Sequence, residues 1–441
     1  MTSDPSIYST GGIESPIEPL VASQLNYRMI DPVGKPNHAR EPQISVGSEN
    51  AKELVIRWLR QPHSAPATFP TDPSEWPALV AFIENAGLAG IVLERAASTR
   101  DELPQWAMER LRPAAARTAA DNLHAMHHTE PLIGAFHRGG VPVMLLKGAA
   151  LITTVYQRPD LRPMSDVDLL IRPDDAERAA ELLLREGCRP GFALLSDDFF
   201  PKYYYETEWI IPSPRPVRLD VHARPFRPLR ISRTMPDDAF WKDPRRTRIG
   251  ATDVWVPRLE FLFIHLAAHL AFHGCTRLLW MYDLKRFSEV HGTTLDWRLI
   301  VESSRRWRLS VAVHRGVQCA AEMLGPICPP EVLKNLAAQP GSWRDRLSLA
   351  RAPHDAEAPL LHVLCNLLCT PGVAFRLGYL RALLLPGRGH LAGLYKRRHA
   401  GWVAVAHIWR CLRVIGRVFY SPLVASLHFV GRLYRPGLGN A

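Results

Sequence analysis

The sequence lacks the cysteine pattern of a disulfide scaffold. Its seven cysteines are an odd number, and no two of them form a CxxC pair. Small secreted domains usually carry an even set of cysteines, and structural zinc sites usually contain CxxC pairs. The cysteine content therefore favours a reduced intracellular protein.

Signals for export and membrane insertion are also missing. No uncharged apolar run reaches the roughly 18 residues that a spanning helix needs. Residues 1–5 (MTSDP) show neither the basic segment nor the apolar core of a secretory signal. We therefore expect a cytoplasmic protein.

Acidic residues are absent from the C-terminal part of the chain. No Asp or Glu follows Glu357, whereas eleven Lys and Arg lie between Arg376 and Arg435. The preceding part carries 43 basic and 43 acidic side chains, so the net charge of +11 belongs to the C-terminal segment. The pI of about 9.5 therefore does not indicate a nucleic-acid surface over the whole molecule.

The 441 residues, 47% of them hydrophobic, are enough for two or three domains. A leader rich in Pro, Ser, Gly and Asn shows no periodicity and is expected to be disordered. The predicted segments are this leader at 1–49, an N-terminal helical region at 50–140, a catalytic core at 141–256, a helical bundle at 257–345 and a basic helical C-terminal region at 346–441.

Strand and helix patterns alternate within the predicted core. An apolar run at 141–146 predicts a strand, a glycine turn then opens a helix at 148–156, and a second strand follows at 166–171. A helix at 173–186 and strands at 203–211 and 218–222 complete the core. The fold class is therefore α+β, with a small mixed β-sheet flanked by N-terminal helices and a C-terminal helical bundle.

Helical periodicity dominates on both sides of the core. Before it, the pattern predicts helices at 51–60, 74–97 and 104–138, the last one ended by Gly139-Gly140. After it, helices are predicted at 260–272, 278–291, 297–308 and 311–324.

Two carboxylates lie one residue apart in the second apolar run of the core. Alternate residues of a strand point to the same side, so Asp166 and Asp168 are expected to converge while Val167 and Leu169 face the interior. An ionised pair next to a core is costly unless a cation lies between the two groups. Because oxygen ligands suit Mg²⁺, the pattern predicts a metal site.

A third carboxylate lies in the run 217–222 (VRLDVH). If this run is a strand, Arg218, Asp220 and His222 share the face opposite to the core. Asp220 can then join the first two aspartates. Three carboxylates around metal ions are typical of in-line phosphoryl or nucleotidyl transfer. The alternative is a solvated strand edge.

The turn at Gly148 is a candidate anion site. Backbone N–H groups at a strand-to-helix turn, together with the positive helix end, can bind phosphate. Lys147 adjoins the turn and can add a point charge. The alternative is an ordinary solvated lysine.

Together these motifs resemble the DNA polymerase β-type nucleotidyltransferase superfamily, whose core has a glycine turn, a helix, Asp-x-Asp and a later Asp. More closely, the chain is similar to a bacterial family labelled "uncharacterised nucleotidyltransferase", over roughly residues 75 to 400. The segments that carry the resemblance are LKGAAL at 146–151, Tyr156, Arg162, SDVDLL at 165–170, LDVH at 219–222, LAAH at 266–269, WMYDL at 280–284 and LGYLR at 377–381.

The resemblance implies roles for individual residues. Asp166, Asp168 and Asp220 would be the catalytic residues and would bind Mg²⁺ or Mn²⁺. The nucleotide-binding residues would be Lys147, Gly148, Ala149, Arg162 and Ser165. The usual Gly-Ser turn is here Gly148-Ala149, which removes a hydroxyl that contacts phosphate. Lys147 is expected to compensate for this loss.

Three histidines follow a helical spacing in the predicted bundle. His265, His269 and His273 fall on one helical face, where pairs at i and i+4 can bind zinc. No HExxH pattern is present, and we favour the alternative of a stripe packed against the core. The resemblance places His269 and Asp283 near an acceptor pocket, to which His222 can also belong.

The basic C-terminal segment allows two interpretations. A basic amphipathic helix from Lys396 to about Val430 can lie on an anionic membrane surface or bind an acidic partner. Alternatively, it packs on the bundle with its arginines outward. Nucleic acid is less expected, because aromatic residues are not interleaved as a stacking platform.

The resemblance implies an enzyme that moves an NMP from an NTP, such as ATP, to an acceptor and releases pyrophosphate. The balanced charge before Glu357 favours a small-molecule, sugar or peptide acceptor, in a bacterial biosynthetic pathway. Two alternatives stay open. One is a toxin-like nucleotidyltransferase acting on tRNA or RNA ends, and the other is a catalytically silent binding protein that kept the fold.

Overall fold

The computed structural model describes residues 46–61, 73–99, 103–191, 202–339, 341–351, 365–385 and 408. The predicted disordered leader and the predicted basic amphipathic helix lie almost entirely outside these residues. The chain divides into two compact units, the larger made of 32–192 and 198–380. The smaller unit has few described residues, so all that follows concerns the larger one. The predicted division into five segments stays a prediction.

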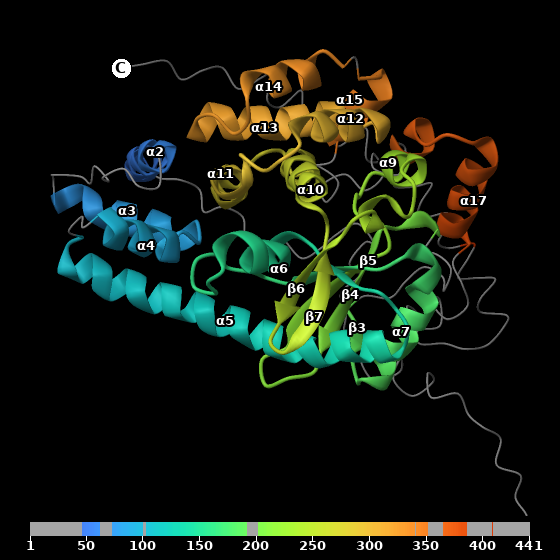
Figure 1. Ribbon diagram of the computed structural model, residues 1–441, viewed down its shortest axis with the longest axis horizontal. Helices are drawn as coiled ribbons and strands as arrows, with labels where there is room; N and C mark the ends of the chain where they lie inside the picture. Colours follow the sequence, from blue (N-terminus) through green and yellow to red (C-terminus); the bar gives the residue numbers. More distant parts are fainter. Residues whose placement is uncertain are drawn as a thin grey trace, which may run out of the picture. The chain divides into compact units, whose positions relative to one another are not determined.

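A seven-stranded mixed sheet forms the centre of this unit (Figure 1). The strand order is β3-β4-β5-β2-β1-β7-β6, with β2 and β5 paired in parallel. The predicted α+β class with a mixed sheet is thereby confirmed. The strands are β1 (Met144–Leu145), β2 (Val167–Leu170), β3 (Arg189–Pro190), β4 (Glu206–Ile211), β5 (Val217–His222), β6 (Arg245–Ile249) and β7 (Thr252–Val256).

The sheet is larger than the sequence predicts, because the hairpin of β6 and β7 has no clear apolar alternation. The side chains of β6 are mostly exposed, and Ile249 alone among them is buried. Gly250 makes the turn with φ +56°, a conformation that favours glycine. The backbone N–H of Ala251 then donates to Glu130 at 2.6 Å, which fastens the hairpin to the long helix α5.

Among the described residues, four α-helices precede the sheet. The predicted helix at 74–97 is wrong as a single element, because Gly87 at φ +71° separates two helices. The 34-residue helix is confirmed and ends at Gly139 as predicted. These helices are α2 (Val46–Arg60), α3 (Trp76–Asn85), α4 (Ala89–Thr99) and α5 (Gln105–Arg138).

The helices after the core agree closely with the prediction. In Figure 1, α5 runs below the sheet, whereas α10 and α11 lie above it. Nearly every residue of α10 is buried, as expected for a helix that is apolar on all sides. Within and after the core lie α6 (Lys147–Leu151), α7 (Ala176–Arg185), α9 (Leu229–Thr234), α10 (Leu259–Phe272), α11 (Leu278–His291), α12 (Trp297–Arg306), α13 (Ser310–Leu324), α14 (Pro330–Ala337), α15 (Trp343–Arg351) and α17 (Val373–Leu384).

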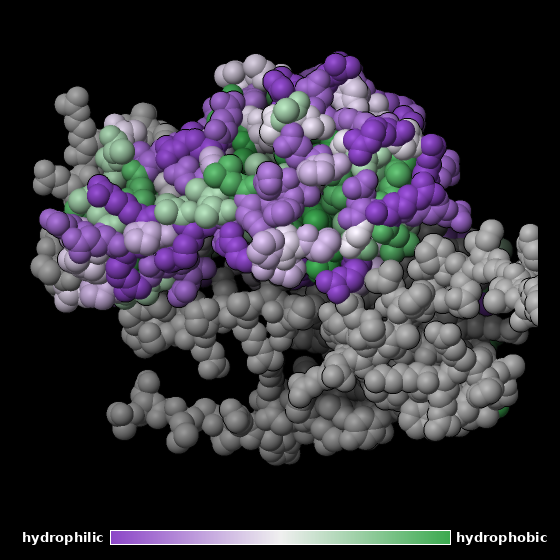
Figure 2. All heavy atoms as spheres, turned by 90° about the horizontal axis from the view of Figure 1, so that it is seen from below, coloured by the Kyte–Doolittle hydropathy of each residue, from purple (hydrophilic) through white to green (hydrophobic). Residues whose placement is uncertain are grey.

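No single helix in the described ranges is both long enough and apolar enough to span a membrane. Only α3 and α4 taken together pass the test of length and apolar composition, and they are bent by 119° at their break. The face shown in Figure 2 is mostly hydrophilic, with smaller hydrophobic areas between the polar ones.

An ion pair joins α9 to α15 and makes the free energy of unfolding depend on pH in the acid range. Arg230 Nε donates to Asp345 Oδ1 at 2.7 Å, and Ser342 also donates to this carboxylate. Burial alone would raise the pKa of Asp345, but the bonds from Arg230 and Ser342 lower it below its usual value. Its stabilising effect is therefore present above the unfolded pKa, near 3.9, and is lost as pH falls through the folded pKa.

We expect Asp345→Asn to lower the free energy of unfolding by about 1–3 kcal/mol at pH 7. This is less than the loss of a fully buried pair, because the site is partly open. The difference from wild type should begin to shrink as pH falls below about 4, because protons then bind the Asp345 carboxylate of the unfolded chain more strongly than that of the folded protein. Urea unfolding at pH 7, 5 and 3.5 measures it, and a difference that is the same at all three pH values would contradict the assignment.

Candidate active site

One face of the sheet carries a row of carboxylates. Asp168 on β2 lies opposite Asp220 on β5, and Asp220 lies opposite Glu208 on β4. Residues opposite one another on adjacent strands share a face, so the three carboxylates point to the same side. One row further along, His222 lies opposite Glu206.

The sequence places these groups on one face because β5 alternates strictly. Leu219 and Val221 are buried on the opposite face of the sheet, as is Val167 on β2. The helix α5 contacts β2, β6 and β7 and contributes to the surrounding core. A shift of one residue in the register would move the carboxylates into the apolar face, so the alternation fixes the pairing.

The polar residues converge around Asp168. One ligand atom each from Asp168, Asp220 and His222 lie within 4.8 Å of one another. These residues are 2%, 0% and 1% exposed. Among the described residues, this is the one group of three or more His, Cys, Asp or Glu side chains whose ligand atoms lie close enough together to hold a metal ion. Asp168 and Asp220 are two buried carboxylates close together, and a divalent cation would relieve their repulsion, so the residues fit a metal ion.

The side chain of Lys147 contacts the group formed by Asp168, Asp220 and His222. Its Nζ is 2.6 Å from Asp168 Oδ1, and its side chain is 17% exposed. Burial alone would raise the pKa of Asp168, but the Lys147 ammonium and the imidazole of His222 hold it well below its usual range. The backbone of Lys147 has φ +42°, which is strained for a residue with a side chain. The lysine is thus held beside the carboxylate at the start of α6.

The glycine turn packs closely on the loop before β2. A Cβ added to Gly148 would meet the Arg162 guanidinium and would lie 2.8 Å from Met164 Cγ. No other residue fits at this position without displacing one of them. The helix α6 continues directly into a π-helical turn (Ile152–Tyr156), and the Leu146 N–H donates to the Asp168 carbonyl at 3.0 Å. The turn and the carboxylate row are therefore coupled through the backbone.

A buried network holds the loop before β2. Arg162 Nη2 is 3.1 Å from Asp283 Oδ2, and the Tyr156 hydroxyl donates to Asp283 Oδ1 at 2.7 Å. Burial raises the pKa of Tyr156 well above 10, and the Asp283 carboxylate raises it further. Asp283 lies on α11, so the network joins the helical bundle to the core. Because its carboxylate is buried and bonded to Arg162 and Tyr156, Asp283 stabilises the loop next to the site. Its predicted role in an acceptor pocket stays a prediction.

Asn122 on α5 holds the same loop from the other side. Its side-chain N–H groups donate to the carbonyls of Pro159 and Arg162 at 2.7 and 2.8 Å, and its Oδ1 accepts from the Met164 N–H. The residue is buried. In the sequence, Asn122 is a single Asn in an Ala-rich helical segment. Nothing in that segment indicates that it bonds to a loop some 40 residues further along the chain.

Asp166 and Ser165 lie just before β2, outside the strand. Asp166 is half-buried and does not belong to the group around Asp168, although its charge interacts with Arg162 and Arg218. Since β2 begins at Val167, the alternation that would align Asp166 with Asp168 does not extend to it. Ser165 is exposed and Ala149 is buried. The ligand and nucleotide-binding roles of these residues stay predictions.

The histidine stripe packs against aromatic side chains, and of its three members His265 is buried whereas His269 and His273 are half-buried. The His265 ring lies 5.5 Å from the Phe226 ring and 6.0 Å from the Phe240 ring. Burial, followed by the charge of Lys147, lowers the pKa of His265 to about 3. His269 lies 4.6 Å from Trp280, and burial followed by His273 holds its pKa well below 6.5. The described residues show no metal group that includes this stripe.

Glu206 and Glu208 were missed by the sequence reasoning. Both lie on β4, where they alternate with the buried Thr207 and Trp209. This is the same signal that identified Asp220, and it could have been applied to the strand predicted at 203–211. Glu208 pairs with Arg218 at 2.5 Å.

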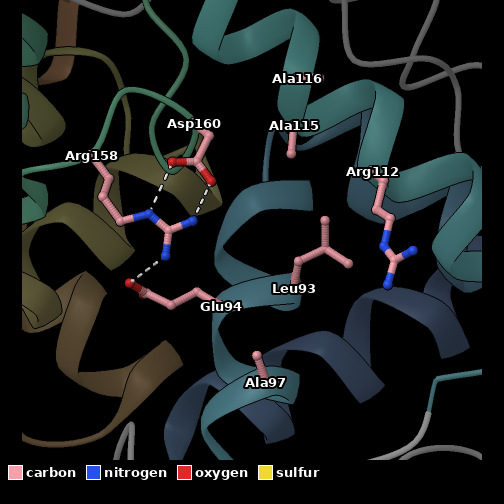
Figure 3. A pocket seen from close by; sticks show the side chains of 8 residues that line it. All are labelled: Leu93, Glu94, Ala97, Arg112, Ala115, Ala116, Arg158 and Asp160. Atoms are coloured by element: carbon pink, nitrogen blue, oxygen red, sulfur yellow. Dashed lines mark hydrogen bonds and ion pairs between the residues drawn. The ribbon is translucent and has the colours of Figure 1, made fainter.

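A separate pocket lies between α4, α5 and the loop after the π-helical turn (Figure 3). Its volume is about 340 Å³. Arg158 bonds to Asp160 through two nitrogens and lies 3.6 Å from Glu94, whereas Arg112 points in from α5. None of the predicted site residues lines it.

Comparison with known proteins gives one match. A family model described as "Uncharacterised nucleotidyltransferase" matches residues 72–325, well over half of the chain. The match contains the carboxylate row, the glycine turn and both Asp283 and Asn122. No curated protein and no solved structure matches the chain. The chain therefore belongs to the uncharacterised nucleotidyltransferase family.

Proposed function

We propose that the protein is a divalent-metal-dependent nucleotidyltransferase that moves an NMP from an NTP to a nucleophilic acceptor. The observation that carries the proposal is the position of Asp168 beside Asp220, on one sheet face and directly beneath the Lys147-Gly148 turn. Membership in a nucleotidyltransferase family supports the reaction class.

The residues of the chain divide into two groups in this proposal. Asp168 and Asp220, with Asp166 as the sequence predicts, would hold Mg²⁺ or Mn²⁺. A divalent ion bound there would supply positive charge against the triphosphate. Lys147 and the backbone N–H groups of the Gly148 turn would bind the phosphates, while Arg162 supports the turn from below.

The chemical step is an in-line displacement at the α-phosphorus. The acceptor oxygen or nitrogen forms a bond to this phosphorus, and the bond to the bridging oxygen breaks. Pyrophosphate leaves with the bonding electron pair. The proton of the acceptor passes to the Asp220 carboxylate and then to water.

The acceptor is proposed to be a small molecule, a sugar or a peptide in a cytoplasmic biosynthetic pathway. The part of the chain before Glu357 has balanced charge, whereas a long polyanion would call for many basic contacts. This supports a small acceptor over an RNA end.

Label transfer tests the proposal. Full-length protein is incubated with Mg²⁺ or Mn²⁺ and each α-labelled NTP, together with panels of sugars, peptides, tRNA and cell extract. We expect label in a small acceptor and release of pyrophosphate. Label on tRNA with a steep salt dependence would replace the small-acceptor assignment by the toxin-like alternative. A folded protein that binds no metal-NTP complex would refute the enzyme and favour a silent binding protein.

A further inference from the structure

We infer that the divalent metal ion of this site is bound through a nitrogen ligand, His222 Nε2, together with the carboxylates of Asp168 and Asp220. Glu206 positions the imidazole. The inference rests on the proposed function for the presence of a metal. It adds a ligand and a metal class: a first-row transition ion such as Mn²⁺ in preference to Mg²⁺.

The spacing of the donor atoms carries the first step. His222 Nε2 is 2.8 Å from Asp168 Oδ1, and the Asp220 carboxylate completes a group within 4.8 Å. Two donors at adjacent positions of one ion, each about 2.1 Å from it, are about 3 Å apart. The nitrogen and the oxygen already have this separation.

The second nitrogen of the ring supports the same assignment. His222 Nδ1 is 3.5 Å from Glu206 Oε2, and both side chains are buried. The two residues are opposite one another in the β4–β5 register. Histidine ligands regularly direct the other ring nitrogen to a carboxylate, which fixes the tautomer and the ring orientation. Nε2 faces the site because it lies 2.8 Å from Asp168 Oδ1, whereas Glu206 lies beside the other nitrogen at ion-pair distance, without a hydrogen bond to it.

The burial of His222 favours a role as a metal ligand over a role in an acceptor pocket. His222 is 1% exposed, and the ring of Tyr205 lies 5.7 Å from its own. A side chain that contacts an acceptor needs an accessible atom, whereas a metal ligand does not. The close group contains the imidazole but not Asp166, so His222 adds a ligand that the sequence did not assign to the metal.

The metal class follows from the donor set. Mg²⁺ prefers an octahedron of oxygens and keeps several waters. Imidazole binds first-row transition ions more strongly than it binds Mg²⁺. A site with one nitrogen and two carboxylates therefore selects a transition ion.

Pulsed EPR on Mn²⁺ tests the inference directly. Full-length protein is treated with chelator and loaded with Mn²⁺, and the ¹⁴N hyperfine coupling of a directly bound imidazole is measured. We expect this coupling in wild type and its replacement by the ¹⁵N pattern when histidine is ¹⁵N-labelled. Mn²⁺ bound without nitrogen coupling would overturn the inference without any variant.

Three variants sharpen the test. His222→Gln should remove the coupling and weaken Mn²⁺ binding at least tenfold. Glu206→Gln should keep the coupling and weaken binding about tenfold to a hundredfold, as for other carboxylates behind a ligand. His265→Gln removes a neighbouring imidazole and should leave the coupling unchanged. Loss of the coupling in this control, with circular dichroism of a folded protein, would assign the nitrogen elsewhere and overturn the inference.

The outcomes separate the inference from the proposed function. Nitrogen-coordinated Mn²⁺ in a folded protein that binds no metal-NTP complex supports the inference and refutes the enzyme. Label transfer with Mn²⁺ but without nitrogen coupling supports the enzyme and overturns the inference. Competition in which Mg²⁺ displaces Mn²⁺ at equal concentration would overturn the metal preference.

Discussion

Replacing Asp168 by Asn is expected to slow nucleotidyl transfer by about a thousandfold or more. Asn keeps the size of the side chain but removes the charge that faces Lys147, Asp220 and His222. A metal ion contributes several kcal/mol of transition-state stabilisation, and about 4 kcal/mol corresponds to a factor near one thousand. The rate of label transfer at saturating NTP measures the loss.

The matched control for this variant is Asp174→Asn. Asp174 is an exposed aspartate that follows β2 in the sequence and lies outside the carboxylate row. It should keep wild-type activity. Because Asp168 also pairs with Lys147, thermal unfolding must show that Asp168→Asn is folded. Transfer at the wild-type rate in this folded variant would refute the assigned site.

Replacing Asp283 by Ala is expected to lower the free energy of unfolding by about 3–5 kcal/mol. The change leaves the buried guanidinium of Arg162 without its carboxylate and removes the acceptor of the Tyr156 hydroxyl. Breaking one side of a buried pair costs about this much, because an unpaired charge stays in the interior. Urea unfolding followed by tryptophan fluorescence measures the difference.

A double variant separates the charge from the packing. Arg162→Met together with Asp283→Leu replaces the pair by apolar side chains and should recover at least half of the loss. A double variant as unstable as Asp283→Ala would show that the buried charge is not the cause. Arg162 packs against Gly148, in the turn proposed to bind the phosphates. The single variant Asp283→Ala, which removes the partner of Arg162, should therefore also weaken NTP binding.

The helical part of the fold could be predicted from local pattern. The helix predicted at 278–291 has the same bounds in the structure, since apolar periodicity and a following glycine are both local. The hairpin of β6 and β7 could not be predicted, because its first strand exposes arginines and depends on Glu130 of α5. The pattern at 74–97 also predicted one helix, whereas the structure has two helices separated at Gly87.

The same limit applies to the candidate site. A period of two was enough to bring Asp168 and Asp220 to one face, because both lie inside regular strands. It failed for Asp166, which lies outside β2. The contact of Arg162 with Asp283 joins residues 121 positions apart, and nothing local to either residue indicates the other. Charges that find their partners through tertiary packing are not visible in a single sequence.

The ammonium of Lys147 has a consequence for how the site is assembled. Since Lys147 is part of the chain and its Nζ lies 2.6 Å from Asp168 Oδ1, the folded protein itself supplies a counterion to the carboxylate row. A divalent ion bound there would compete with this intramolecular cation for the carboxylates. Lys147, at the start of the glycine turn, would then be placed to bind an anionic group of a substrate, so that binding of a cation at the carboxylates would favour binding of an anion next to it.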